Sequence, residues 1–359
     1  MKKIIALALV LIMTALPAMA MPADMTAMTS IPVEYAFTTP STEFSMTTAW
    51  FMLVNFMGQG KAETAAQMEN LGLTVVQQEN YGKPMSDHSH TSAYTLATGQ
   101  LPVRGELRNA AVITIRGTSD GEWYSNFDIA SENGNNCTVA ENFYAATEAI
   151  YAAVKPELEK LEDPVIIATG YSRGAGCSNL LGLMLNEDFN KEDIYIYTYA
   201  TPTTVRGEVE NDENIFNLVN MNDMITSMPP QAWGFTRAGI DIELRDSEFV
   251  NTEMHLMFLT MLGVCPDLDS YYNDRHAVDA PGLSEDGVTM YELFIAFADL
   301  MSGDQALMAS AQELINTLSA AQNDFSAFLP LFYQSMLGNT GENQHMPEVY
   351  IRLMMALGM

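Results

Sequence analysis

The stretch Pro164–Leu185, PVIIATGYSRGAGCSNLLGLML, decides how the rest of the chain is interpreted. It opens with the apolar, β-branched run Val165–Thr169, which predicts a buried strand. Gly170–Gly174 then fits the pattern G-x-S-x-G around Ser172, and apolar residues follow at helical spacing: Cys177, Leu180, Leu181 and Met184. A serine in a tight, glycine-flanked turn between a strand and a helix is typical of a nucleophile elbow. The simpler interpretation is a serine that only caps a helix.

Apolar runs on both sides of this stretch predict a sheet. Before it, strands are expected at Leu73–Gln77, Ala93–Thr98 and Ala110–Ile115, and helices at Thr47–Met57, Ala62–Leu71 and Val139–Leu161. After it, strands are expected at Ile194–Ala200 and Ile215–Val219. Since strands alternate with helices from Ala110 onward, we expect an α/β fold with a mostly parallel sheet flanked by helices.

The first twenty residues have the pattern of a secretory signal. Lys2 and Lys3 precede the apolar run Ile4–Leu16, and Ala18–Ala20 resembles a cleavage site. The apolar run is too short to predict a spanning helix, and no cysteine follows the cleavage site to carry a lipid anchor. No later stretch reaches 18 uninterrupted apolar residues, so we expect an exported, extracellular protein without an integral membrane segment.

Charge and cysteine usage restrict the partners. The chain has 16 Lys and Arg against 45 Asp and Glu, a formal charge of −29 that disfavours binding to nucleic acid and anionic membranes. Three cysteines leave at least one unpaired, and the sequence leaves a Cys137–Cys265 bridge open. Their spacing fits no zinc motif. The oligomeric state is left open too.

Beyond residue 233 the sheet pattern fades. Helices are expected at Met254–Val264, Met290–Met301 and Ala306–Ala320, with a polar loop at Asp267–Gly287. We therefore divide the chain into a signal peptide at 1–20, an α/β core at 21–233, a helical insertion or cap at 234–336, and a C-terminal segment at 337–359. Within the core, Met21–Pro40 is expected to be a leader along the surface.

Two predicted strands end in polar residues. Ala110–Ile115 runs into the R-G-T-S sequence Arg116–Ser119, and Ile215–Val219 runs into Asn220–Asp223. Ligands of open α/β sheets bind at the carboxyl ends of the strands. Asp223 follows the serine where an α/β-hydrolase has its acid, although an Asp after a strand is also an ordinary turn former.

Five ordered segments together resemble the class 3 lipase family of α/β-hydrolases, and in particular exported lipase-like proteins of Gram-positive gut bacteria. The segments are VITIRGT (112–118), TGYSRGAGCSNLL (169–181), YTYATPTT (197–204), NLVNMNDMITSMPP (217–230) and HMPEVYIRLM (345–354). The resemblance implies an α/β-hydrolase fold with Ser172 as nucleophile, Asp223 as acid and His345 as base. It also implies oxyanion-hole N–H groups from Thr118 and Arg173. Many members carry His and Leu where this chain has Tyr171 and Arg173, so these two positions are expected to influence specificity.

The base has to be one of five histidines. His88 and His90 precede the serine and form an H-x-H pair in a polar loop, where we expect them to be solvated. His255 lies in an apolar stretch and is expected to be a core or capping residue. The remaining choice is between His276 and His345, and the match of the 345–354 segment favours His345.

The resulting expectation is an exported serine hydrolase that acts on a glycerolipid or another carboxylic ester and needs no metal or organic cofactor. A carbohydrate-ester or feruloyl-type esterase is the alternative with the same chemistry. A catalytically inactive binding protein with the same fold is a third hypothesis. An intact Ser172, Asp223 and His345 argues against the third.

Overall fold

The computed structural model describes residues 31–58, 60–84, 87, 89–119, 121–130, 137–210, 212–245, 259, 261–277, 289–301, 304–321 and 344–357. The predicted signal peptide and His88 and His255 therefore lie outside the described residues. Among the residues that are described, no helix is both long and apolar enough to cross a bilayer.

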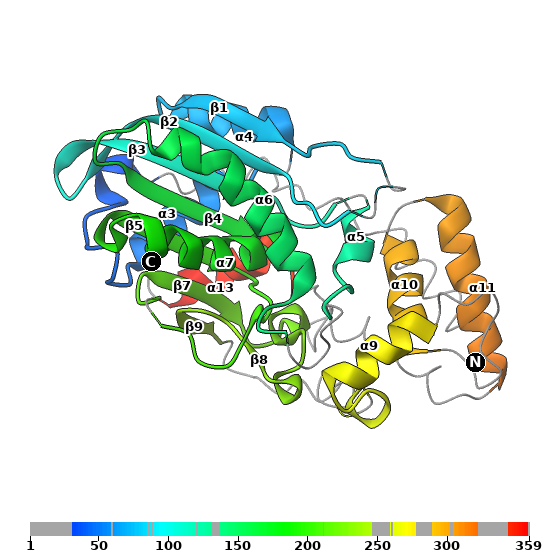
Figure 1. Cartoon of the computed structure of the whole chain (residues 1–359). Coiled ribbons are helices and arrows are strands. Elements are labelled where there is room, and N and C mark those ends of the chain that lie inside the picture. The colour runs from blue at the N-terminus through cyan, green and yellow to red at the C-terminus, as the bar shows by residue number, and fades with distance from the viewer. Residues whose placement is uncertain are drawn as a thin grey trace.

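A seven-stranded sheet forms the centre of the molecule (Figure 1). Its spatial order is β1 (Thr74–Glu79), β2 (Tyr94–Val103), β3 (Glu106–Ile115), β4 (Val165–Tyr171), β5 (Ile194–Tyr199), β7 (Ile215–Asn220) and β9 (Ile240–Leu244). The pairs β1–β2 and β2–β3 are antiparallel, whereas β3, β4, β5, β7 and β9 run parallel. The predicted mostly parallel sheet flanked by helices is thus confirmed.

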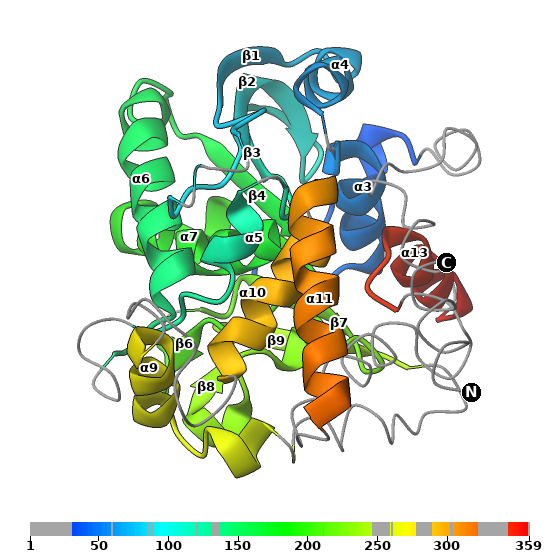
Figure 2. The same cartoon turned by 90° about the vertical axis from the view of Figure 1, so that its right-hand side faces the viewer.

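Helices cover both faces of this sheet (Figure 2). On one face lie α6 (Glu141–Leu158) and α7 (Arg173–Asp188), and on the other lie α3 (Met46–Phe56) and α13 (Pro347–Ala356). Helix α4 (Lys61–Asn70) packs beside β1 and β2. Every residue of β4 and β5 is buried, as expected for central parallel strands that are covered on both faces.

A group of three helices lies beyond one side of the sheet: α9 (Leu268–Ala277), α10 (Met290–Met301) and α11 (Gln305–Ala321) (Figure 1). We call these helices the cap. They approach the core at the short helix α5 (Glu122–Ser125), which follows β3. A two-stranded ribbon of β6 (Val205–Arg206) and β8 (Phe235–Thr236) completes the described regular structure, together with short 3₁₀ turns.

Three sequence-based expectations need correction, and one question that the sequence left open is answered. The predicted loop Asp267–Gly287 contains helix α9, whose buried Leu268 and Tyr271 give it an apolar side that the polar composition masked. The sheet extends past residue 233, because β9 pairs with β7 inside the segment assigned to the cap. In the expected surface leader, Ala36 and Phe37 are fully buried. The open question was a Cys137–Cys265 bridge: all three cysteines belong to the described residues, and none of them forms a disulfide.

Candidate active site

Ser172 occupies the sharp turn between β4 and α7. Its backbone has φ 56° and ψ −121°, a region that costs energy for a residue with a side chain and is concentrated at functional sites. The flanking glycines have a steric cause. A Cβ on Gly170 would lie 2.2 Å from the carbonyl oxygen of Gly174, and a Cβ on Gly174 would lie 2.0 Å from that of Ile115. The G-x-S-x-G pattern is therefore what this close crossing of β3, β4 and α7 requires.

A continuous hydrogen-bonded line joins Ser172, His345 and Asp223. His345 Nε2 lies 2.8 Å from Ser172 Oγ, and His345 Nδ1 lies 2.7 Å from Asp223 Oδ2. The three residues are 6, 2 and 1 % exposed, respectively. In the sequence, Ser172 lies 173 residues before His345, and Asp223 lies 122 residues before it. The fold thus brings together, in a water-poor environment, the three residues that the sequence singled out.

Each member of this line is held by a local element. Ser172 follows β4, Asp223 follows β7, and both strands are parallel, so their carboxyl ends meet at one edge of the sheet. Asp223 caps the turn Met224–Ser227, where its Oδ1 accepts the N–H of Ile225 at 3.0 Å. His345 stands just before α13, which begins with Pro347 in its first turn.

Two buried tyrosines fix the positions of His345 and Asp223. The hydroxyl of Tyr171 donates to the backbone carbonyl of His345 at 3.0 Å, and that of Tyr350 donates to Asp223 Oδ2 at 2.8 Å. Burial, reinforced by the nearby Asp223 carboxylate, raises the pKa of both phenols well above its ordinary value, so both remain donors. Tyr171 therefore supports the loop that carries His345. The Tyr171 side chain lies behind the site. The sequence does not predict the contact of Tyr350 with Asp223, although Tyr350 lies within the 345–354 segment.

The segment after β3 supplies Thr118 beside Ser172. Its neighbour Ser119 donates its N–H to Glu122 Oε2 at 2.9 Å, and Arg116 Nη2 donates to the same oxygen at 3.2 Å. Burial raises the pKa of Glu122, whereas Arg116 and Arg173 act in the opposite direction. On the other side, Arg173 is the first residue of α7, whose opening N–H groups lack partners within the helix. The arrangement offers backbone donors next to the serine.

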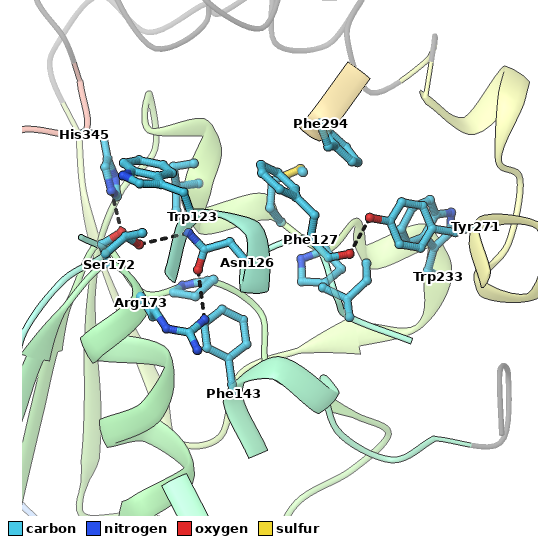
Figure 3. Close-up of a pocket in the computed structure, with 16 residues that line it drawn as sticks. Trp123, Asn126, Phe127, Phe143, Ser172, Arg173, Trp233, Tyr271, Phe294 and His345 are labelled. Carbon is cyan, nitrogen blue, oxygen red and sulfur yellow. Dashed lines mark hydrogen bonds between the residues drawn. The ribbon is translucent and has the colours of Figure 1, made fainter. Parts of the chain in front are cut away.

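The pocket in front of Ser172 is mainly apolar and encloses about 740 Å³ including its mouth. Its walls carry many aromatic and aliphatic side chains, among them Trp123, Phe127, Ile129, Phe143, Ile225, Met228, Trp233, Tyr271 and Phe294 (Figure 3). The cap contributes Tyr271 and Phe294. Phe294 stacks on Phe127 with ring centres 4.6 Å apart, and the Tyr271 hydroxyl donates to the Phe127 carbonyl at 2.5 Å. The cap therefore forms part of the pocket wall.

Of the other histidines, His90 and His276 belong to the described residues. His90 is half-buried rather than solvated: its Nε2 lies 2.9 Å from Asp128 Oδ2, and its Nδ1 lies 3.1 Å from Ser125 Oγ. The expectation for His90 was wrong because the loop that carries it folds against α5. His276 belongs to α9. Within the described residues, no group of three His, Cys, Asp or Glu side chains is arranged to hold a metal ion.

The parallel sheet, the strained serine between β4 and α7, and the hydrogen-bonded line behind it define a serine hydrolase with an α/β-hydrolase fold. Residues 112–233 match the family model described as Lipase (class 3), and this match supports a lipase-type ester hydrolase. No curated protein sequence matches the chain.

Among solved structures, the chain is similar to fungal lipases. The triacylglyceride lipase of Rhizomucor miehei is 18% identical with a TM-score of 0.36, and the match covers 48% of this chain and 67% of the lipase. The Rhizomucor miehei lipase in complex with its propeptide is 20% identical with a TM-score of 0.37, covering 48% and 57%. The lipase of Rhizopus microsporus var. chinensis is 15% identical with a TM-score of 0.38, covering 65% and 80%. The expected likeness to proteins of Gram-positive gut bacteria stays a prediction.

Proposed function

We propose that this chain is an exported serine ester hydrolase in which Ser172 is the nucleophile, His345 the base and Asp223 the acid that orients it. The observation that supports this assignment is the unbroken line of 2.8 and 2.7 Å contacts from Ser172 Oγ through the imidazole to Asp223. A nucleophile within hydrogen-bond reach of a base that is itself oriented by a third group is the arrangement used for nucleophilic catalysis.

In the first half of the reaction, Ser172 Oγ attacks the ester carbonyl carbon while His345 Nε2 takes the hydroxyl proton. The carbonyl oxygen becomes negative and accepts the N–H groups of Thr118 and Arg173. The bond to the alcohol oxygen then breaks, and His345 gives its proton to the departing alcohol. The acyl group stays on Ser172.

In the second half, a water molecule attacks the acyl carbon and His345 takes its proton. The bond to Ser172 Oγ breaks, the serine regains its proton from His345, and the carboxylic acid leaves. Throughout, Asp223 stabilises the imidazolium and holds Nδ1 as the donor. The Tyr350 hydroxyl and the Ile225 N–H donate to further lone pairs of the carboxylate, which holds it directed at His345.

The pocket favours an ester with an apolar acyl group. Its walls consist largely of aromatic and aliphatic side chains, whereas the polar groups gather at the Ser172 end (Figure 3). A glycerolipid or a simple carboxylic ester fits this division. The aromatic residues Trp123, Phe127 and Phe294 also suit a planar aromatic acyl group. A feruloyl-type esterase is therefore the second candidate.

Fluorophosphonate labelling followed by peptide mapping tests the nucleophile. We expect one adduct, on Ser172, and no adduct in Ser172→Ala. Labelling elsewhere, or hydrolysis retained in Ser172→Ala, would overturn the assignment. A protein that carries no adduct and hydrolyses no ester would be the binding protein of the third hypothesis.

The base is tested by comparing His345→Ala with His276→Ala on p-nitrophenyl esters. We expect a loss of kcat of at least a thousandfold in the first variant and little change in the second. The reverse result would move the base to α9. Running acetyl, octanoyl and feruloyl esters in parallel distinguishes the two substrate classes by kcat/KM.

Export follows from the sequence of residues 1–20 alone. We expect the protein to accumulate in the culture medium with its N-terminus at residue 21, as read by N-terminal sequencing. Protein that stays inside the cell with Met1 retained would contradict export and leave the hydrolase assignment untouched.

A further inference from the structure

The side chain of Arg173 is enclosed by hydrogen-bond acceptors. It is 2 % exposed, although it directly follows the nucleophile. Its guanidinium has five hydrogen bonds to four acceptors: Thr91 O from Nε at 3.2 Å and from Nη2 at 3.1 Å, Ser92 Oγ at 3.0 Å, Asn142 O at 3.2 Å and Asn126 Oδ1 at 3.0 Å. Burial of a cation is costly unless it is bonded in this way. The position where specificity was expected is thus occupied by a fully engaged buried cation.

One of these bonds determines how the Asn126 amide is turned. A guanidinium has only donors, so Asn126 has to present its carbonyl oxygen to Arg173. The amide NH₂ then points the other way, to Thr118 Oγ1 at 2.9 Å. An NH₂ group only donates, so the Thr118 oxygen has to accept. The hydroxyl hydrogen of Thr118 is left for a different acceptor.

The carbonyl oxygen of a substrate bound in the pocket could be that acceptor. Thr118 and Ser172 line the same cavity, and Figure 3 shows Asn126 between the Arg173 guanidinium and the Ser172 end of the pocket. We propose that Arg173 is a positioning residue: through Asn126 it directs the hydroxyl of Thr118 to donate to the carbonyl oxygen of the substrate. This inference rests on the proposed function, because it adds a third donor to the two backbone N–H groups at the oxyanion.

The backbone around Asn126 is held separately from its amide. Its carbonyl accepts from Asn142 Nδ2 at 3.2 Å, and its N–H donates to the Glu122 carbonyl at 3.2 Å. Loss of the guanidinium would therefore allow the amide to rotate while the main chain keeps its place. A rotated amide presents an oxygen to Thr118, which would then donate its hydroxyl hydrogen to Asn126 rather than to the substrate.

A double-mutant cycle on kcat tests the relay, with Thr118→Val, Arg173→Met and the double variant assayed on one p-nitrophenyl ester. Thr118→Val removes the hydroxyl and keeps the N–H, and we expect kcat to fall on the order of a hundredfold at little changed KM. Arg173→Met should lower kcat about tenfold or more in the native background. In the Thr118→Val background it should change kcat less than twofold, because the hydroxyl that it directs is gone.

Two results would overturn the proposal and leave Arg173 as a purely structural residue. One is a loss of kcat in the double variant equal to the product of the losses in the two single variants. The other is a loss in Arg173→Met that appears in KM alone. Arg173→Lys serves as the conservative variant, since it retains a buried donor and should recover part of kcat. If Arg173→Met does not fold, Asn126→Leu takes its place in the cycle, because it removes the relay while four of the five guanidinium bonds remain.

Failure of the relay and failure of the proposed function give different results. Ser172→Ala is assayed alongside. If Ser172→Ala retains hydrolysis, the nucleophile assignment is wrong. If Ser172→Ala is inactive and the cycle is additive, only the role of Arg173 is wrong.

Discussion

The phenol of Tyr350 donates a 2.8 Å hydrogen bond to the same carboxylate oxygen, Asp223 Oδ2, that accepts from His345. Both residues are almost completely buried. The phenol also accepts the N–H of Asn220, the last residue of β7, at 3.2 Å. Helix α13 therefore connects the two residues: it begins two positions after His345, and its Tyr350 holds the Asp223 carboxylate that contacts this histidine.

Tyr350→Phe removes this hydrogen bond without leaving a large cavity. We expect kcat to fall about tenfold, which corresponds to roughly 1.4 kcal/mol, because a hydrogen bond to a charged group contributes about that much or more. KM should stay within about twofold, since Tyr350 is not among the residues that line the pocket. Tyr171→Phe is the matched control for the other buried phenol, which donates to the backbone carbonyl of His345. A larger loss in Tyr171→Phe would contradict the importance assigned to the Asp223 contact.

Gly174→Ala should prevent correct folding of the elbow. The added Cβ would lie 2.0 Å from the carbonyl oxygen of Ile115, which belongs to the central sheet and has no room to shift. We expect the free energy of unfolding to drop by about 3 kcal/mol or more, measured by urea denaturation. Gly60→Ala is the control, because nothing lies within 4 Å of its added Cβ. Equal stability of the two variants would refute the steric explanation of the motif.

His90 should make the protein less stable as the pH falls. Burial, with further contributions from Arg173 and Arg275 against that of Glu141, lowers the pKa of this histidine below 6.5. The adjacent Asp128 is also paired with Arg275, so its charge is shared. Between the lowered pKa and 6.5 the unfolded chain binds more protons than the folded one, so stability decreases on going down through pH 6.5.

Thermal melts of wild type and His90→Gln between pH 7.5 and 5 isolate this contribution. We expect the melting temperature of His90→Gln to fall less steeply than that of wild type over this range. If the melting temperatures of the two proteins fall in parallel with pH, His90 has the same pKa in the folded and unfolded states, which would contradict this prediction.

Phe294→Leu should alter chain-length preference. Phe294 of the cap stacks on Phe127 in the pocket wall, so a smaller side chain lengthens the space for an acyl group. We expect the kcat/KM ratio of octanoyl to acetyl p-nitrophenyl ester to rise about tenfold, within the range of pocket effects on apolar groups. Tyr35→Ala, an exposed aromatic residue outside the pocket, should leave the ratio unchanged. An unchanged ratio in Phe294→Leu would place the acyl group elsewhere.

Part of this architecture is encoded locally and could be read from the sequence. The apolar runs at 110–115, 165–169, 194–200 and 215–219 predict strands that the sheet contains, because burial on both faces demands continuous apolar residues. The glycines at 170 and 174 mark the turn, because side chains are excluded there. Chain order placed Asp223 after the serine. The choice of His345 over His276 needed the family segment, since no local pattern distinguishes them.

The rest depends on contacts between residues far apart in the chain, which local spacing does not encode. Tyr171 and Arg173 marked departures from the family, but only the fold shows that one bonds to the His345 carbonyl 174 residues away and the other to acceptors from Thr91 to Asn142. Leu268 and Tyr271 became buried because a core accepts them, whatever the polarity of their neighbours. The sequence by itself determined six of the seven strands of the sheet and the tight turn at Ser172, since hydrophobic period and turn geometry are properties of adjacent residues. Tertiary packing alone decided the direction of each buried side chain, because that direction is set by the partners that satisfy its polar groups.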